Sequence, residues 1–289
     1  MTLRVIAPGA LATVQDLGRD GRAALGIARS GALDRGALRL ANRLVGNPEG
    51  AAAVELTVGG FRALADTDLW VALSGARGDV SVGGRAVDSH TPMLWPAGRE
   101  LEVGVFSTGV RAYLAVRGGL DTPLWAGSRA TDTLAGLGRP ALRPGDVLPV
   151  GPVPHDPVPA IGGVPWRMRS DGPIEVQLAP GPRADWFAAS ALPLLFETVW
   201  TIGSDADRVG LRLDGPELLR ARGGELPSEG MVPGALQVPP SGRPTILLAD
   251  GPVTGGYPVI AVATDASLDA LGQARPGGRL RFSHARPPV

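Results

Sequence analysis

The stretch "AVELTVGGFRALADTDLWVALSGARGDVSVGG", residues 53–84, contains three short apolar runs, each of which ends at glycine. The runs are "VELTVGG" (54–60), "LWVALSG" (69–75) and "DVSVGG" (79–84). Turn residues that recur at intervals of about ten residues are typical of antiparallel barrels and sandwiches. This stretch therefore predicts a mainly β fold.

Similar runs extend the pattern in both directions along the chain. The first part adds "LRVIAPG" (3–9), "ELEVGVF" (100–106) and "RAYLAVRGG" (111–119), and the second part has "IEVQLAPG", "FETVWTIG", "ALQVP", "PTILLADG" and "RLRFS". Residues 151–172 are rich in proline, which fixes φ and favours an extended connection. We predict an N-terminal β-rich half over 1–150, a connection over 151–172 and a barrel-like C-terminal half over 173–289.

One helix is expected in the first half, near residues 34–46, within "SGALDRGALRLANRLVGN" (30–47). Asp34 can cap its first turn, and Gly46 with Pro48 can end it. Asn42 lies about 40° around the helix from Leu38, at the border of the apolar face. Asn42 either supports the polar loop that precedes the helix or bonds a neighbouring backbone group. Short helices are also expected at 183–190, at 216–222 and from Ser267.

Composition excludes several classes of chemistry. Among 289 residues the 28 basic side chains are all arginine and balance 28 acidic ones, so neither nucleic acid nor an anionic membrane is an expected partner. Without lysine the chain offers no Schiff-base lysine, no P-loop lysine and no attachment point for biotin. Without cysteine it has no disulfide or thiolate. The three histidines lack metal-ligand spacing, so no metal site is predicted.

The location is also indicated by the sequence. The N-terminus "MTLRVIAPGA" has neither the basic flank nor the apolar core of a signal peptide. No apolar run approaches the roughly 18 residues that a membrane helix needs. We therefore expect a cytoplasmic protein without a membrane segment.

Polar side chains are concentrated in glycine-rich loops, where backbone can approach a ligand closely. Arginine forks in such loops suit carboxylates and phosphates. The alternative is that each side chain makes a turn hydrogen bond or a surface ion pair. The loops hold Asp132 and the following candidate site residues: Gln15, Asp16, Arg19, Ser30, Asn42, Ser128, Arg129, Arg208, Gln237, Asp250, Thr254 and Tyr257.

The same loops carry a family resemblance. The blocks "TVQDLGRDGRAALGIARSGALDRGALRLANRLVGN", "YLAVRGGLDTPLWAGSRATD", "SDADRVGLRLDGP" and "ALQVPPSGRPTILLADGPVTGGYPVI" resemble the allophanate hydrolase subunit 2 family, also called the biotin-dependent carboxyltransferase family. The resemblance runs from about Leu3 to Phe282. It implies a cyclophilin-like β-barrel architecture, and a complex with two further proteins. These are the B subunit, which is an allophanate hydrolase subunit 1-like protein, and the A subunit.

The resemblance leaves three functions open. The first is ATP-driven opening of 5-oxo-L-proline to L-glutamate, as in the 5-oxoprolinase members, with ATP and Mg²⁺ as co-substrate. The second is a carboxyltransferase component of a urea carboxylase or allophanate system, in which biotin and a lysine would come from other chains. The third is a non-enzymatic antagonist of a kinase inhibitor.

Lactam opening needs cations for phosphate, donors for the lactam oxygen and a carboxylate that orients water. We assign catalytic roles to Asp16, Asp250 and Arg129. The remaining candidates are assigned to substrate binding: Gln15, Arg19, Ser30, Asn42, Ser128, Arg208, Gln237, Thr254 and Tyr257.

Tryptophan positions bear on the partner. Aromatic anchors at segment edges suit a protein interface, whereas burial in a barrel core is the alternative. The tryptophans beside turns or segment ends are Trp95, Trp125, Trp166, Trp186 and Trp200.

Overall fold

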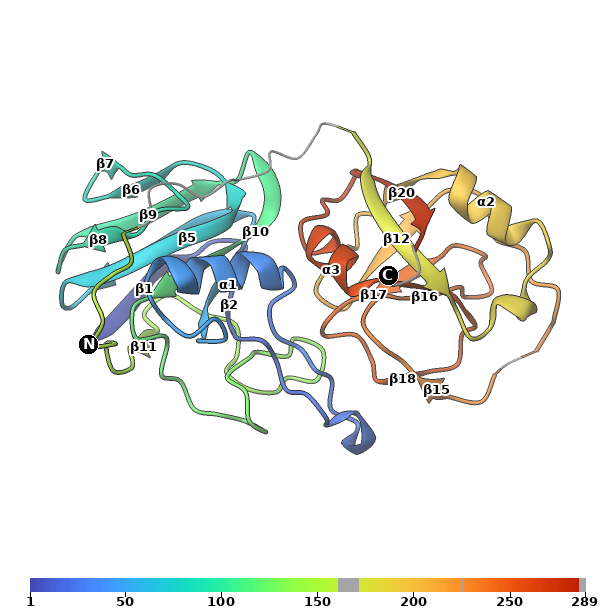
Figure 1. The fold of residues 1–289 in the computed structure, drawn as a ribbon, viewed down its shortest axis with the longest axis horizontal. Coiled ribbons are helices and arrows are strands. Elements are labelled where there is room, and N and C mark those ends of the chain that lie inside the picture. The colour runs from blue at the N-terminus through green and yellow to red at the C-terminus, as the bar shows by residue number, and fades with distance from the viewer. Residues whose placement is uncertain (161–171, 225, 286–289) are drawn as a thin grey trace. The chain divides into compact units, whose positions relative to one another are not determined.

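The computed structural model describes residues 1–160, 172–224 and 226–285. The chain divides into two compact units, shown as ribbons in Figure 1. Unit 1 combines Met1–Arg19 with Ser30–Arg167, and unit 2 combines Asp20–Arg29 with Met168–Val289. Residues 161–171 of the predicted connection at 151–172 lie outside the described residues, so the predicted domain limits stay a prediction.

Unit 1 contains two antiparallel sheets, with the orders β11-β1-β4-β9-β6-β7 and β2-β3-β10-β5-β8. The first sheet has the strands β1 (Thr2–Pro8), β4 (Gly59–Ala65), β6 (Val80–Val82), β7 (Arg85–Ala86), β9 (Glu100–Val105) and β11 (Val147–Pro149). The second has β2 (Leu11–Gln15), β3 (Ala53–Thr57), β5 (Leu69–Arg77), β8 (Met93–Trp95) and β10 (Thr108–Val116). The three runs of residues 53–84 therefore form strands, as predicted.

The two faces of the five-stranded sheet bury different clusters, because successive side chains of a strand point to opposite faces. Leu56 and Leu114 join the large core that also contains Val5 and Val103 of the other sheet. Tyr113, next to Leu114, belongs instead to a cluster with helix α1. The sheet is thus covered on one face by its neighbour and on the other by α1.

Helix α1 (Arg35–Leu44) confirms the helix predicted at 34–46. The Asp34 side chain accepts a hydrogen bond from Ala37 N over 2.8 Å, which satisfies a backbone donor of the first turn. Leu38 and Leu44 are fully buried against strands β3, β5 and β10. The capping aspartate and the apolar face together fix where this helix starts and how it lies on the sheet.

Unit 2 is a closed barrel with the strand order β12-β19-β16-β17-β14-β13-β20. Its strands are antiparallel neighbours except β12 and β20, which pair in parallel. The strands are β12 (Ile174–Pro180), β13 (Val199–Ile202), β14 (Gly210–Asp214), β16 (Ala235–Gln237), β17 (Thr245–Leu247), β19 (Val259–Ala263) and β20 (Arg279–His284). A two-stranded sheet, β15 (Glu229–Gly230) with β18 (Thr254–Gly255), completes unit 2. The predicted mainly β fold with a barrel is confirmed.

The short helices agree only in part with the sequence. A 3-10 turn, Ala184–Trp186, occupies the predicted helix at 183–190, and α3 (Asp265–Leu271) begins two residues before Ser267. The helix predicted at 216–222 is wrong, because that segment is irregular and bonds to distant parts of the chain, through Leu218 N to Gly242 O and through a single bridge between Arg220 and Phe187. Helix α2 (Ala191–Glu197) and the 3-10 turn Ala23–Leu25 were not predicted.

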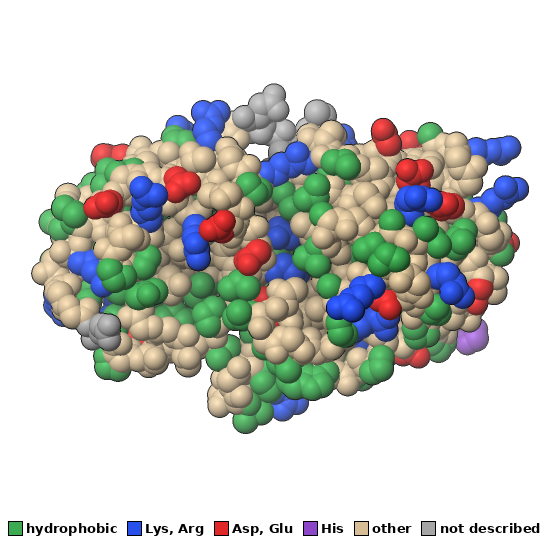
Figure 2. Space-filling view, turned by 180° about the vertical axis from the view of Figure 1, so that it is seen from behind, with side chains coloured by type: hydrophobic (Ala, Val, Ile, Leu, Met, Phe, Trp, Pro, Cys, Tyr) green, Lys and Arg blue, Asp and Glu red, His purple; other side chains and the backbone are tan. Residues whose placement is uncertain are grey.

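The surface carries both signs of charge. On the face shown in Figure 2, arginine side chains are interspersed with acidic ones, in agreement with the zero net charge. Trp95 and Trp200 are fully buried, whereas Trp125 is 36% exposed, so burial explains at least two of the tryptophans. Trp166 lies outside the described residues. No helix within the described residues combines the length and apolarity required to span a bilayer.

Candidate functional site

The carboxylate of Asp16 holds two loops of unit 1 together. It follows β2 and accepts hydrogen bonds from Ser128 Oγ at 2.6 Å, Arg129 N at 2.7 Å and Gly18 N at 2.8 Å. A carboxylate that accepts hydrogen bonds from several donors is held in one position. The structure thus brings Asp16 and Ser128 together, and these contacts fit a positioning role of Asp16 toward Ser128 and Arg129.

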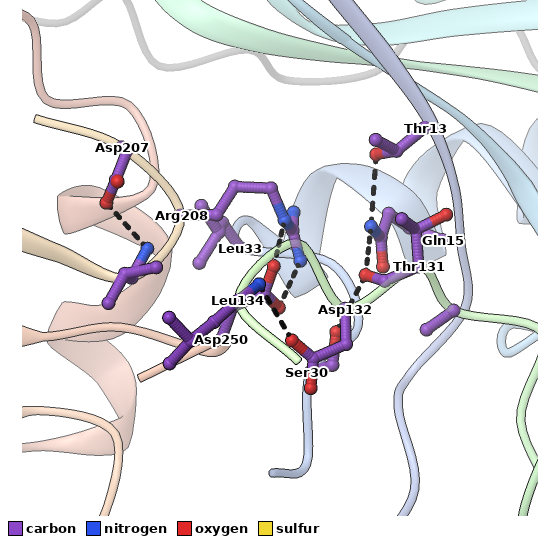
Figure 3. A network of polar contacts seen from close by, with 12 residues as sticks. Thr13, Gln15, Ser30, Leu33, Thr131, Asp132, Leu134, Asp207, Arg208 and Asp250 are labelled. Carbon is purple, nitrogen blue, oxygen red and sulfur yellow. Dashed lines mark hydrogen bonds and ion pairs between the residues drawn. The ribbon is translucent and has the colours of Figure 1, made fainter. Parts of the chain in front are cut away.

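A second group of polar contacts surrounds the carbonyl of Thr131. Gln15 Nε2 and Ser30 Oγ each donate to Thr131 O over 2.9 Å, as Figure 3 shows. Gln15 Nε2 also contacts Thr13 Oγ1 at 3.0 Å. Ser30 adopts a positive φ of 53°, in the left-handed region that non-glycine residues rarely occupy. The structure therefore brings Gln15 and Ser30 to one peptide group.

Asp132, next to Thr131, is 1% exposed. Its Oδ1 accepts from Leu134 N at 3.0 Å and Ala135 N at 2.9 Å, an Asx-type turn. Its Oδ2 is buried and has no hydrogen-bond partner in the described part of the chain. The sequence placed Asp132 in a polar loop without assigning it a role, and no sequence signal marks this unsatisfied oxygen.

The two arginines of this region have different surroundings. Arg19 is 2% exposed, donates to the carbonyl of Ala130 and lies 5.4 Å from the centre of the Trp125 ring, within the range of a cation–π contact. Arg129 pairs with Asp121, and its side chain is 26% exposed. Arg129 is thus the more accessible guanidinium of the pair.

A buried network supports these loops from the helix-facing side of the five-stranded sheet. Tyr113 donates to Glu55 Oε2 at 2.7 Å and accepts from Asp34 N at 2.8 Å. Burial, followed by the nearby charge of Glu55, raises the pKa of Tyr113 well above its ordinary value. Arg111 lies 3.7 Å from the same Glu55 carboxylate. Tyr113 therefore stays a neutral donor that ties the start of α1 to the sheet.

Asn42 is used by the backbone around it. Its Nδ2 donates to Ala51 O at 2.8 Å and Glu49 O at 3.2 Å, and its Oδ1 accepts from Asn47 Nδ2 at 3.0 Å. Asn42 is fully buried. Of the two interpretations, these contacts favour the bonding of neighbouring backbone, away from the Asp16 and Thr131 contacts.

In unit 2, Arg208 and Asp250 form a buried ion pair. Arg208 Nε donates to Asp250 Oδ2 at 2.9 Å, and Nη2 donates to Oδ1 at 3.0 Å (Figure 3). The two side chains are 1% and 0% exposed. This fork geometry makes Asp250 the counter-ion of Arg208.

Unit 2 also has a pocket of about 670 Å³, within the usual size range of small-molecule sites. Gln237 and Tyr257 line it, together with two ion pairs that the sequence did not single out. Arg212 contacts Asp205 at 3.0 Å, and Arg243 contacts Asp214 at 3.4 Å. Thr254 lies on β18 and is exposed, and neither it nor Arg208 lines this pocket.

The candidates therefore divide into those of unit 1 and those of unit 2, and neither set forms a single cluster. Asn42 has separate partners in unit 1. In unit 2, Arg208, Asp250 and Thr254 are not among the residues that line the pocket of Gln237 and Tyr257. No group of three or more His, Cys, Asp or Glu side chains that could hold a metal occurs within residues 1–160, 172–224 and 226–285. Chemically, the two groups offer guanidinium cations, amide and hydroxyl groups, and fixed carboxylates.

Comparison with known proteins identifies the class. The family described as carboxyltransferase domain, subdomain A and B, matches residues 25–284. The chain belongs to this family.

Individual relatives show which members of the family this chain is similar to. The chain is 38% identical to the C subunit of 5-oxoprolinase from Escherichia coli, over 97% of this chain and 90% of the relative. The crystal structure of Kluyveromyces lactis urea amidolyase matches with a TM-score of 0.92 and 31% identity, over 99% of this chain but 19% of that one. The crystal structure of TTHA0988 matches with a TM-score of 0.88 and 40% identity, over 98% of this chain and 55% of that one. The chain thus spans about half of one structural relative and a small part of the other.

Proposed function

We propose that this chain is the C subunit of an ATP-dependent 5-oxoprolinase, which opens 5-oxo-L-proline to L-glutamate together with the A and B subunits in the cytoplasm. One observation carries the proposal: the chain covers 90% of the C subunit of E. coli 5-oxoprolinase at 38% identity. Its match to urea amidolyase covers only 19% of that chain. Because the relative is named as one subunit of an enzyme, we place the activity in a complex.

The chemistry of lactam opening agrees with the side chains available. A five-membered lactam is a stable amide, so transfer of a phosphoryl group from ATP to its oxygen makes the carbonyl carbon open to attack by water. Arg129, the accessible guanidinium, is proposed to neutralise charge on the transferred phosphoryl group. Asp16 holds Arg129 through its backbone amide and is proposed as a positioning residue.

In this proposal ATP with Mg²⁺ is the co-substrate. The pocket of unit 2, lined by Gln237 and Tyr257, has the size of a small-molecule site and is proposed to bind a substrate of the complex.

The decisive experiment measures ADP release that depends on 5-oxoproline, with the A and B subunits present and this chain added or omitted. We expect turnover only when the chain is added. Arg129→Ala should reduce kcat by roughly 100-fold or more, whereas Asp121→Ala, which changes only its exposed partner, should stay within a few-fold of the wild type. Turnover that does not depend on this chain would reject the proposal.

A carboxyltransferase component is the second candidate, supported by the family's description and by the TM-score of 0.92 to urea amidolyase. Because this chain has no lysine, any lysine-dependent step would require another chain. Transfer of labelled carboxylate from carboxybiotin to urea, in place of 5-oxoproline-dependent ADP release, would favour this function.

The third candidate, an antagonist of a kinase inhibitor, makes a different prediction. It requires tight binding of the partner and no loss of turnover in Asp16→Ala, Arg129→Ala or Asp250→Ala.

A further inference from the structure

Two residues next to the Thr131 carbonyl of unit 1 each carry a buried side-chain oxygen: Gln15 bonds this carbonyl through Nε2, and Asp132 follows Thr131 in the chain. The two oxygens are Oε1 of Gln15 and Oδ2 of Asp132, and neither has a hydrogen-bond partner among the described residues. The two residues are 0% and 1% exposed. A buried acceptor left unsatisfied costs about 1–3 kcal/mol, so two of them in one network require an explanation.

The orientation of the Gln15 amide is fixed by its neighbour. Thr131 O can only accept, so the atom of Gln15 that lies 2.9 Å from it must be the nitrogen. Ser30 Oγ donates to the same carbonyl at 2.9 Å. Oε1 of Gln15 is therefore an acceptor and cannot be exchanged for the amide nitrogen by a flip.

The orientation of Asp132 is fixed in the same manner. Leu134 N and Ala135 N hold Oδ1 at 3.0 and 2.9 Å, and Asp132 N donates to Leu137 O at 2.9 Å. The second carboxylate oxygen is thus presented by a rigid turn. An acceptor held in this manner has little freedom to turn toward a different donor.

We propose that Gln15 Oε1 and Asp132 Oδ2 form an acceptor site for a ligand nitrogen that carries N–H groups. Both atoms can only accept, and Asp132 brings a negative charge, so the complementary group is an amide N–H or an ammonium. Lactams and ureas share this amide N–H, and opening a lactam leaves an ammonium. The choice of 5-oxoproline as a probe rests on the proposed function, whereas the acceptor site rests on the two unsatisfied oxygens.

This site has a testable consequence for specificity. A site built to receive N–H should reject an analogue that lacks it, because the acceptors then stay unpaired. The lactone analogue of 5-oxoproline, with a ring oxygen in place of N–H, has the same shape but offers an acceptor. We expect the wild-type complex to bind 5-oxoproline at least about tenfold more tightly than the lactone.

The variant Asp132→Asn separates this role from a structural one. Its Oδ1 keeps the contacts with Leu134 N and Ala135 N, while its amide nitrogen replaces the unsatisfied oxygen with a donor. We expect the preference to disappear or to reverse in favour of the lactone. Asp121→Asn, which alters an exposed carboxylate of the same unit, should keep the wild-type preference.

The experiment is calorimetric titration of both ligands into the complex with the A and B subunits, for the wild type and the two variants. Equal binding of lactam and lactone by the wild type overturns the proposal, and this arm does not depend on the folding of any variant. An unchanged lactam preference in folded Asp132→Asn overturns it as well.

If the proposed function is wrong, the wild-type complex will show no ADP release that depends on 5-oxoproline, and this result is separate from the binding measurements. In that case the acceptor site is tested with urea against acetone, which has a similar shape and no N–H. Preference for urea that Asp132→Asn abolishes supports the site. Equal binding of the two, or no binding of any of the four probes, overturns it.

Discussion

Arg208 and Asp250 form a two-pronged ion pair that is almost completely buried, with N–O distances of 2.9 and 3.0 Å. The segments that carry them are also joined through the backbone, since Asp250 N donates to Arg208 O at 3.1 Å. Charges buried to this degree have lost their hydration, so removal of one deprives the other of its charged, hydrogen-bonded partner. The pair therefore bears first on the stability of unit 2.

Asp250→Ala should lower the free energy of unfolding by about 3–5 kcal/mol. Urea unfolding of the purified chain measures this loss. Asp205→Ala breaks the pair with Arg212, whose side chains are 65% and 70% exposed, and should cost less than about 1 kcal/mol. An Asp250→Ala variant that keeps wild-type stability and loses only turnover would instead support the catalytic role predicted from the sequence.

A second prediction concerns the anchor at Asp16. The Asp16 carboxylate has two acceptor oxygens, which accept hydrogen bonds from Gly18 N, Ser128 Oγ and Arg129 N. The variant Asp16→Asn keeps only one of these oxygens. At least one donor loses its partner, at a cost of about 1–3 kcal/mol. Hydrogen exchange should become roughly tenfold faster or more at the amides of Gly18 or Arg129.

The control for this anchor is Asp121→Asn, which removes the negative charge from an exposed partner of the Arg129 side chain and leaves the backbone bonds in place. Its amide exchange at Gly18 and Arg129 should match that of the wild type. Unchanged exchange in Asp16→Asn would contradict the anchoring role.

The strands were predicted where short apolar runs end at glycine or another turn residue, as in residues 53–84, because both features act locally. Several strands were not singled out, among them β2, β4, β8, β11, β14 and β19. Helix α2 was missed because Pro193 interrupts its sequence pattern, although proline is tolerated in a first turn. Its burial of Ala191 and Leu195 depends on the surrounding barrel, which local sequence does not encode.

The sequence predicted which loops carry the candidate site residues, but not which of these residues contact one another. Gln15, Asp16 and Ser128 were selected as polar residues beside glycine, and the structure does bring them into one region of unit 1. Their contacts join residues more than 100 positions apart in sequence, such as Asp16 with Ser128. No local pattern shows that Asp16 is fully occupied whereas the neighbouring Asp132 keeps an unsatisfied oxygen.

A third prediction follows from His90, which is 8% exposed and accepts from Gly75 N through Nε2 at 3.3 Å. Burial, and then the positive charge of Arg77, lowers the pKa of His90 from 6.5 to about 4. Between these values the unfolded chain binds the proton and the folded chain does not. Stability from this group is therefore complete above about pH 6.5 and is lost as the pH falls toward 4.

Urea unfolding at pH 7 and pH 5 measures this effect. The wild type should lose on the order of 2 kcal/mol more than His90→Asn over this interval. Asparagine suits the test because it tolerates the positive φ of 64° at this position. Equal slopes in the wild type and His90→Asn would show that His90 titrates normally in the folded chain.

The last prediction compares two glycines with positive φ, Gly31 (+88°) and Gly21 (+74°). A Cβ at Gly31 would lie 2.6 Å from Gly18 N, whereas a Cβ at Gly21 would meet nothing within 4 Å. Gly21→Ala should therefore cost only the backbone strain, about 1–2 kcal/mol. Gly31→Ala should cost about 1–3 kcal/mol more, because overpacking adds to the strain.

The collision at Gly31 is with the peptide whose N–H bonds Asp16, so Gly31→Ala should also displace the Asp16 carboxylate from that donor. Amide exchange at Gly18 should speed up in Gly31→Ala and stay unchanged in Gly21→Ala. In the assembled complex, 5-oxoproline-dependent turnover should fall more in Gly31→Ala than in Gly21→Ala. Equal stability losses in the two variants would mean that the 16–18 loop yields easily, and Asp16 could then not hold Ser128 and Arg129 in a fixed position.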